Sequence, residues 1–151
     1  MDTIDIHAKG PAVEDVQSRL AALGYDVADE RKTGVYGEAT VQAVRAFRRD
    51  RQLADATSID AIAWSALVDA TFTLGDRLLY LRSPYLHGND VRILQTALNI
   101  LGFFYHDVDG IFGGETETAV REFQLNIGLP ADGIAGNTTF QALERLEHVW
   151  K

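Results

Sequence analysis

A short glycine-rich turn that occurs twice limits most strongly what this chain can fold into. The better copy is Asp109-Gly110-Ile111-Phe112-Gly113, followed by Gly114-Glu115-Thr116, and a weaker copy spans residues 33–40. The first glycine suits a positive φ, the two apolar residues suit a small core, and the last glycine lets a helix start in close packing. Two copies in similar surroundings indicate a duplicated unit, so one function must account for both.

Apolar residues recur at steps of three and four in six segments, three around each copy of the turn. In the first half they are Val13, Val16, Leu20 and Leu23, then Val41, Val44 and Phe47, then Ile59, Ile62 or Ala63, Trp64, Leu67 and Val68. In the second half they are Val91, Leu94, Leu98 and Leu101, then Ala119, Val120, Phe123 and Ile127, then Phe140, Leu143 and Leu146. We therefore predict an all-α protein of two tandem three-helix bundles.

The same pattern sets the expected boundaries. The first bundle is predicted at residues 10–70 and the second at residues 89–149, with a linker at residues 71–88. The linker carries too many leucines and tyrosines for a free tether, so we expect it to pack on one or both bundles. Residues 1–9 show no periodicity and are expected to form a loose lead.

Composition excludes several classes of function. The chain has no cysteine, which rules out a thiol nucleophile and a cysteine-based zinc site. Its formal charge of -8 is divided evenly between residues 1–75 and 76–151, so neither half has the basic excess that binds phosphates. We therefore expect no nucleic-acid partner, which disfavours a helix-turn-helix DNA binder. The one basic cluster, at Arg45, Arg48, Arg49 and Arg51, is interpreted as a solvated helix face.

The amino-terminal residues are acidic and contain no apolar run, so we expect no signal peptide in this chain. No stretch approaches the length of a membrane span, and we expect no membrane partner. Both a cell-wall-associated and a cytoplasmic location remain open on this basis.

The side chains that carry chemistry are scattered. The histidines, His7, His87, His106 and His148, form no metal-binding pair at helical spacing. Asp107-Val108-Asp109-Gly110 runs on into apolar residues, unlike a calcium loop that supplies oxygens at alternate positions. We therefore predict no catalytic residue, no metal site and no cofactor.

Several polar residues have a structural interpretation. Asp109 and Asp132 each precede a glycine, and their carboxylates are expected to bond turn amides. Gln17 and Gln95 lie within the apolar face of a predicted helix and are expected to satisfy a buried connection. Tyr36 is expected to fill the core, with the alternative that its hydroxyl meets a ligand at the surface.

Together these motifs resemble the peptidoglycan-binding domain family. They are residues 91–95, Leu98 to Gly102, the Asp-Gly-Ile-Phe-Gly turn, residues 119–124 and Gly128 through Gly136. The resemblance implies three-helix modules that hold cell-wall enzymes on peptidoglycan without doing chemistry themselves. The tandem is similar to the amino-terminal part of actinobacterial N-acetylmuramoyl-L-alanine amidase-like proteins, which implies a catalytic domain further along such a chain. Residues 11–70 match less densely and lack the second Asp-Gly turn, so their ligand binding stays open.

The resemblance implies recognition of peptidoglycan or muropeptides, to target or regulate a cell-wall amidase or hydrolase. Free N–H groups at the helix start after Gly113 suit the carboxylates of stem peptides. The predicted ligand-binding residues are Gly113, Gly114, Thr116, Arg121, Asp109 and Asp132, with Tyr36, Gly37, Thr40 and Arg45 in the first half. The expected partners are peptidoglycan, an attached carboxyl-terminal amidase domain or a cell-wall-synthesis protein. The alternative is a protein-interaction module that contacts a cytoplasmic partner in cell-wall synthesis.

Overall fold

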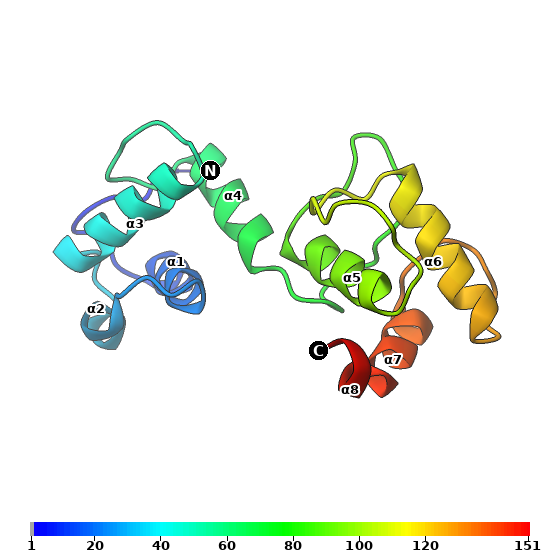
Figure 1. Ribbon diagram of the computed structural model, residues 1–151. Coiled ribbons are helices and arrows are strands. Elements are labelled where there is room, and N and C mark those ends of the chain that lie inside the picture. The colour runs from blue at the N-terminus through cyan, green and yellow to red at the C-terminus, as the bar shows by residue number, and fades with distance from the viewer. Residues whose placement is uncertain (1) are drawn as a thin grey trace. The chain divides into compact units, whose positions relative to one another are not determined.

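The computed structural model describes residues 2–151 and confirms the all-α prediction. These residues divide into two compact units, one ending at Thr71 and the other running from Phe72 to Lys151 (Figure 1). Among the described residues the only β pairings are isolated bridges, so helices and turns build both units. Each unit is described below by itself.

Each unit contains the three predicted helices and one short additional helix. Unit 1 consists of α1 (Pro11–Ala22), α2 (Ala28–Thr33), α3 (Glu38–Asp50) and α4 (Ala61–Thr71). Unit 2 consists of α5 (Asn89–Ile100), α6 (Gly114–Asn126), α7 (Asn137–Arg145) and α8 (Glu147–Trp150). The sequence did not predict α2, which falls in a polar stretch, or α8.

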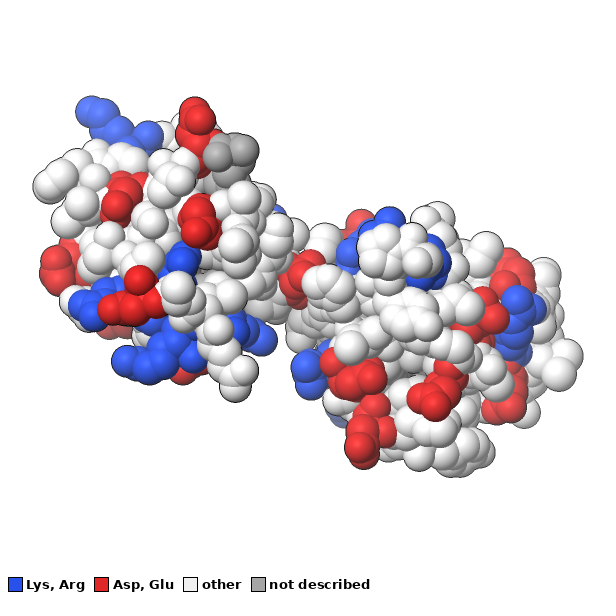
Figure 2. Space-filling model, turned by 90° about the horizontal axis from the view of Figure 1, so that it is seen from above, with Lys and Arg blue, Asp and Glu red and all other residues white. Residues whose placement is uncertain are grey.

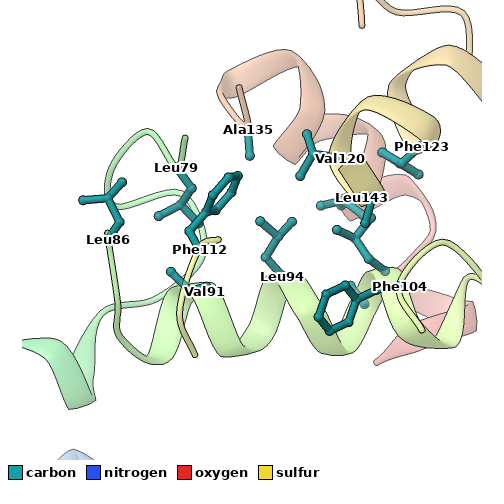
Figure 3. Close-up of a cluster of buried hydrophobic side chains, with 13 residues drawn as sticks. Leu79, Leu86, Val91, Leu94, Phe104, Phe112, Val120, Phe123, Ala135 and Leu143 are labelled. Carbon is teal, nitrogen blue, oxygen red and sulfur yellow. The ribbon is translucent and has the colours of Figure 1, made fainter. Parts of the chain in front are cut away.

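Both turns supply a large aromatic residue to the core, as the sequence predicts, but Ile111, which was also expected to fill the core, is 44% exposed. Tyr36 and Phe112 have no exposed surface. In unit 2, Phe112 lies between Leu79 and Leu94, on the side of the core away from Phe123 (Figure 3). Gly34 and Gly110, the first glycines of these turns, have φ of 68° and 76°, in the left-handed region that favours glycine.

The segment before each bundle is ordered, which corrects the expected loose lead. Ile4 forms a bridge with Ile59, and Lys9 forms one with Val35 beside the first turn. In unit 2, Leu79 and His87 form the matching bridges with Ala135 and Ile111. The pairing gives hydrogen-bond partners to backbone groups of both the lead and the turns. Apolar periodicity does not reveal this requirement.

Residues 72–88 belong to unit 2, so the expected linker is a part of that fold. Leu79 and Leu86 are buried in its core. Arg77 also binds the fully buried Asp90 through two contacts, Nε to Oδ2 at 2.8 Å and Nη2 to Oδ1 at 3.0 Å. This ion pair ties the segment to the first turn of α5.

On the face in Figure 2, basic side chains gather along the lower edge of unit 1 beside acidic ones, and on unit 2 the two kinds of charge are interspersed. Across residues 2–151, no helix has both the length and the apolar character needed to cross a bilayer.

Candidate ligand-binding site at the helix-leading turns

A buried glutamine organises the first turn of unit 2. Gln95 Nε2 donates to Asp109 Oδ1, the Ile111 carbonyl and Thr116 Oγ1, each at 3.0 Å. Its Oε1 accepts from the amides of Asp109 at 3.1 Å and Gly110 at 2.9 Å. Both ends of the amide are thus satisfied, and the turn is held rigidly against α5 and α6. The structural role predicted for Gln95 is observed.

The second turn of unit 2 repeats this arrangement around Gln124, which the sequence analysis missed. Gln124 Nε2 donates to Asp132 Oδ1, the Ile134 carbonyl and Thr139 Oγ1, each at 3.0 Å, and Oε1 accepts from Gly133 N at 3.0 Å. The recurring Gln, Asp-Gly-Ile and Thr were the signal that could have revealed it. Asp109 and Asp132 therefore act as turn acceptors, each also receiving an amide two residues later at 2.9 Å.

In unit 1 the matching Gln17 is only half satisfied. Its Nε2 donates to the Val35 carbonyl at 3.0 Å and Thr40 Oγ1 at 3.1 Å, but its buried Oε1 has no partner. The cause is α2, because the amide of Gly34 donates to the carbonyl of Glu30 and is not available to Gln17. The extra helix has thus replaced one half of the glutamine contact.

Arg48 takes the place of Gln124 in unit 1, which corrects its assignment to a solvated face. It is 4% exposed and donates through Nε to the Ala54 carbonyl at 2.7 Å and through Nη1 to the Ser58 carbonyl at 3.1 Å. A longer donor therefore holds a turn that lacks the Asp-Gly pair.

The predicted ligand residues separate into two groups in unit 2. Gly113, Gly114 and Thr116 lie with Asp109 at the first turn, where α6 begins. Arg121 instead lies at the second turn, where Nη1 donates to the Ala131 carbonyl at 2.9 Å and Nε contacts Glu117 Oε1 at 3.4 Å. From α6 it thus contacts the turn that contains Asp132, whose pKa is lowered first by the Ile134 amide and also by the charge of Arg121.

The matching residues of unit 1 are already engaged. Tyr36 is fully buried and its hydroxyl donates to the Thr57 carbonyl, so it does not present that hydroxyl at the surface. Arg45 forms a two-bond ion pair with Asp55, with distances of 3.1 Å and 3.0 Å. Gly37 and Thr40 both bind the carboxylate of Glu30.

Glu30 covers the start of α3 with four hydrogen bonds. Its Oε1 accepts from Gly37 N at 2.9 Å, Thr40 N at 2.8 Å and Thr40 Oγ1 at 2.6 Å. Its Oε2 accepts from Ala39 N at 2.7 Å. Burial acts to raise the pKa of Glu30, but the hydrogen bonds from Thr40, Ala39 and Gly37 outweigh it and hold the pKa below its ordinary value of 4.5.

This shift predicts an acid-sensitive unit 1. A lowered pKa in the folded state contributes stability above the ordinary value of 4.5, and that stability is lost as pH falls through the folded pKa. Replacing Glu30 by Gln is expected to flatten the loss of unit 1 stability in this acid range and to leave the acid response of unit 2 unchanged. Hydrogen exchange with mass spectrometry, read on peptides of α3 and α6, measures both; an equally steep α3 response in the variant would contradict the assignment.

No group of three or more His, Asp or Glu side chains within residues 2–151 is arranged to hold a metal ion. What the turns offer are backbone donors at helix starts, buried threonine hydroxyls and rigid supporting amides. Such an arrangement is suited to binding an anionic or polar ligand group, since helix N–H groups and the helix dipole favour negative charge.

The fold and its turns define a class of small repeated module. In each of the two helical units, a buried glutamine contacts the turn that leads into the next helix. The model of the putative peptidoglycan binding domain family matches residues 9–59 and 87–143, and the chain belongs to this family. The family match confirms the class that the sequence resemblance indicated.

Curated relatives include cell-wall enzymes. The N-acetylmuramoyl-L-alanine amidase CwlM of Mycobacterium tuberculosis is 34% identical over 94% of this chain and 37% of that protein. The amidase CwlL of Bacillus licheniformis is 32% identical over 92% of the chain and 44% of that protein. The chain thus spans less than half the length of these amidases. Among solved structures, the SleB N-terminal domain is 38% identical, with a TM-score of 0.45 over 49% of this chain and 97% of that one.

Glu30 is the site residue that sequence reasoning missed most completely. It lies in the run Asp29-Glu30-Arg31-Lys32, which resembles any solvated connection. The only available signal was that this connection is two residues longer than its counterpart before Gly110, enough to form α2.

Proposed function

We propose that this chain is a non-catalytic peptidoglycan-binding module whose ligand contact lies at the rim of unit 2, formed by Gly113, Gly114 and Thr116. The observation that carries this proposal is the rigid turn that leads into α6. Gln95 holds this turn through both ends of its side-chain amide, with Nε2 donating to Thr116 and Oε1 accepting from Gly110. A fixed turn holds donors in place before the ligand arrives, which reduces the ordering cost of binding.

The proposed role is to target or regulate a cell-wall amidase or hydrolase, with the chain associated with the cell wall. The names of its relatives support this role, since amidases and spore cortex-lytic enzymes share the module. Its site offers donors but no arrangement of nucleophile and base such as covalent hydrolysis uses. The chemistry is therefore assigned to an attached or partner enzyme.

Co-sedimentation tests the binding. The purified chain is expected to pellet with insoluble peptidoglycan in a saturable manner, while releasing no soluble fragments from it. A protein of similar net charge and no relation to the family serves as the control, because the net charge of -8 sets the nonspecific background. Pelleting no greater than that of the control would refute the proposal.

One observation favours a second candidate, contact with a protein of cell-wall synthesis. The lead of unit 2 exposes several large apolar side chains, namely Leu78, Tyr80, Leu81 and Tyr85 at 55%, 37%, 38% and 54%. Exposed apolar groups of this kind often mark protein contacts. If Leu78→Ser with Tyr85→Ser leaves peptidoglycan pelleting intact but abolishes retention of a purified synthesis enzyme, this second function holds; unchanged retention excludes it.

A further inference from the structure

We infer that the rim of unit 2 is a receptor for a single carboxylate group, and that Glu30 closes the matched rim of unit 1. The inference rests on the proposed function, because it names the ligand group that the unit 2 rim takes. It follows from comparing the two copies of one turn within the same chain.

The two rims are equivalent in backbone and support. Gly37 and Gly113 both precede their helix in extended conformation, with φ of -110° and -99°. Gln17 and Gln95 both donate to the threonine at the third helical position, Thr40 and Thr116. The donors that hold Glu30 in unit 1 therefore have direct counterparts in Gly113, Glu115 and Thr116.

Unit 1 shows what such donors bind. Three backbone amides and one hydroxyl converge on the Glu30 carboxylate at 2.6 to 2.9 Å. Charge-assisted hydrogen bonds of this length are about twice as strong as neutral ones. A carboxylate is thus the group that this backbone arrangement accommodates, with no basic side chain required.

In unit 2 the same donors lack a carboxylate among the described residues and turn inward. The amide of Gly113 donates to the carbonyl of Ile111, two residues back, at 3.1 Å. The hydroxyl of Thr116 reaches the same carbonyl at 3.4 Å, compared with 2.6 Å from Thr40 to Glu30. The hydroxyl contact at 3.4 Å is longer than an ordinary O–H···O bond, and the amide of Gly113 shares its acceptor, so an incoming carboxylate offers the Thr116 hydroxyl a shorter bond.

The other helix starts of this type are covered. Asp60 precedes α4 and accepts from Ala63 N at 2.8 Å. At the start of α7, a Cβ on Gly136 would lie 3.1 Å from the side chain of Leu78, whereas a Cβ on Gly113 or Gly114 would meet nothing within 4 Å. Gly113 and Gly114 therefore have open space in front of them, while Thr116 itself is buried.

A hollow beside this rim can hold the rest of a ligand. It has a volume of about 190 Å³ and lies between α6 and the loop before the turn, where Tyr105, His106 and Glu115 line it. Two acidic residues flank the rim, but each is engaged: Glu115 lies 3.6 Å from His106 Nδ1 and Glu117 lies 3.4 Å from Arg121 Nε. These charges oppose an anion, so we expect the site to bind one carboxylate weakly and to reject multiply charged ligands.

Gly113→Asp provides a sharp test. Asp at the position before a helix accepts from the amides at the second and third helical positions, here Glu115 and Thr116, and so occupies the rim from within. The extended φ of Gly113 and the open space around it permit this side chain. Gly113→Ala is the matched control, since it adds a side chain of similar position without a carboxylate.

The experiment is an NMR titration of the full chain with sodium acetate, against acetamide and sodium chloride as neutral and ionic controls. With acetate alone, the amides of Gly113, Glu115 and Thr116 are expected to shift saturably, and those of Gly37, Ala39 and Thr40 are not. Gly113→Asp is expected to weaken the acetate response at least tenfold, Gly113→Ala to retain it, and Glu30→Ala to create it in unit 1.

An absent or unsaturable shift in unit 2, or an equal response in Gly113→Asp, would overturn the inference. If the amides of Gly37 and Thr40 shift with acetate in the unaltered chain, Glu30 does not close unit 1. This measurement needs no variant of unit 1. Co-sedimentation with peptidoglycan whose carboxyl groups have been converted to amides separates the two proposals. Undiminished pelleting with the amidated material refutes carboxylate recognition and supports peptidoglycan binding. Acetate binding without any pelleting supports carboxylate recognition and refutes peptidoglycan binding.

Discussion

Replacing Gln95 by Leu is expected to lower the free energy of unfolding of unit 2 by about 3 to 5 kcal/mol, because several buried groups lose their partners at a cost of about 1–3 kcal/mol each. Those groups include the amide of Gly110, which donates to Gln95 Oε1, and the buried hydroxyl oxygen of Thr116, which accepts from Gln95 Nε2. Leucine has a similar volume, so the loss comes from unpaired polar groups and not from a cavity. Hydrogen exchange with mass spectrometry, read on α5 peptides, measures it.

Gln17→Leu is the matched control in unit 1. This change removes two donated hydrogen bonds but also removes a buried Oε1 that has no partner. Thr40 keeps its bond to Glu30, and Val35 is exposed enough to use water. We therefore expect a loss of about 1 kcal/mol or less on α1 peptides. Equal losses of stability for Gln95→Leu and Gln17→Leu would contradict the conclusion that α2 has replaced part of the contact made by Gln17.

Replacing Phe112 by Ala is expected to destabilise unit 2 by about 3–5 kcal/mol, the usual cost of emptying a buried phenylalanine site. Phe112 has no exposed surface and lies between Leu79 and Leu94, on separate segments of the unit (Figure 3). The loss is therefore expected to release the lead segment as well as the turn. Urea unfolding followed by hydrogen exchange at Leu79 and Leu94 measures both.

The neighbouring Ile111 supplies the control for this prediction. Its side chain is 44% exposed, although it belongs to the same turn. Ile111→Ala is expected to change the stability of unit 2 by about 0.5 kcal/mol or less, as surface substitutions commonly do. A loss comparable to that of Phe112→Ala would show that the turn is stabilised by its conformation and not by the aromatic residue in the core.

Much of the fold was predictable because it follows from local patterns. Helical periodicity indicated α1, α3 and α4 in one unit and α5, α6 and α7 in the other. The turn glycines were predictable as well, since a positive φ at Gly34 and Gly110 is a local requirement of the backbone. The lead segments were not, because their bridges to Ile59 and Ala135 join residues far apart in the chain.

The candidate site shows the same division. The sequence by itself determined the duplicated turn, the buried glutamine beside it, and the family to which both belong, because these depend on residue type and spacing. Only the tertiary structure decided that the Glu30 carboxylate covers the start of α3. Glu30 is seven residues from Gly37 in sequence, yet its carboxylate reaches that amide because α2 brings it to the start of α3. Which acceptor meets which donor depends on the path of the chain in space, so the pairing cannot be read from spacing along the sequence.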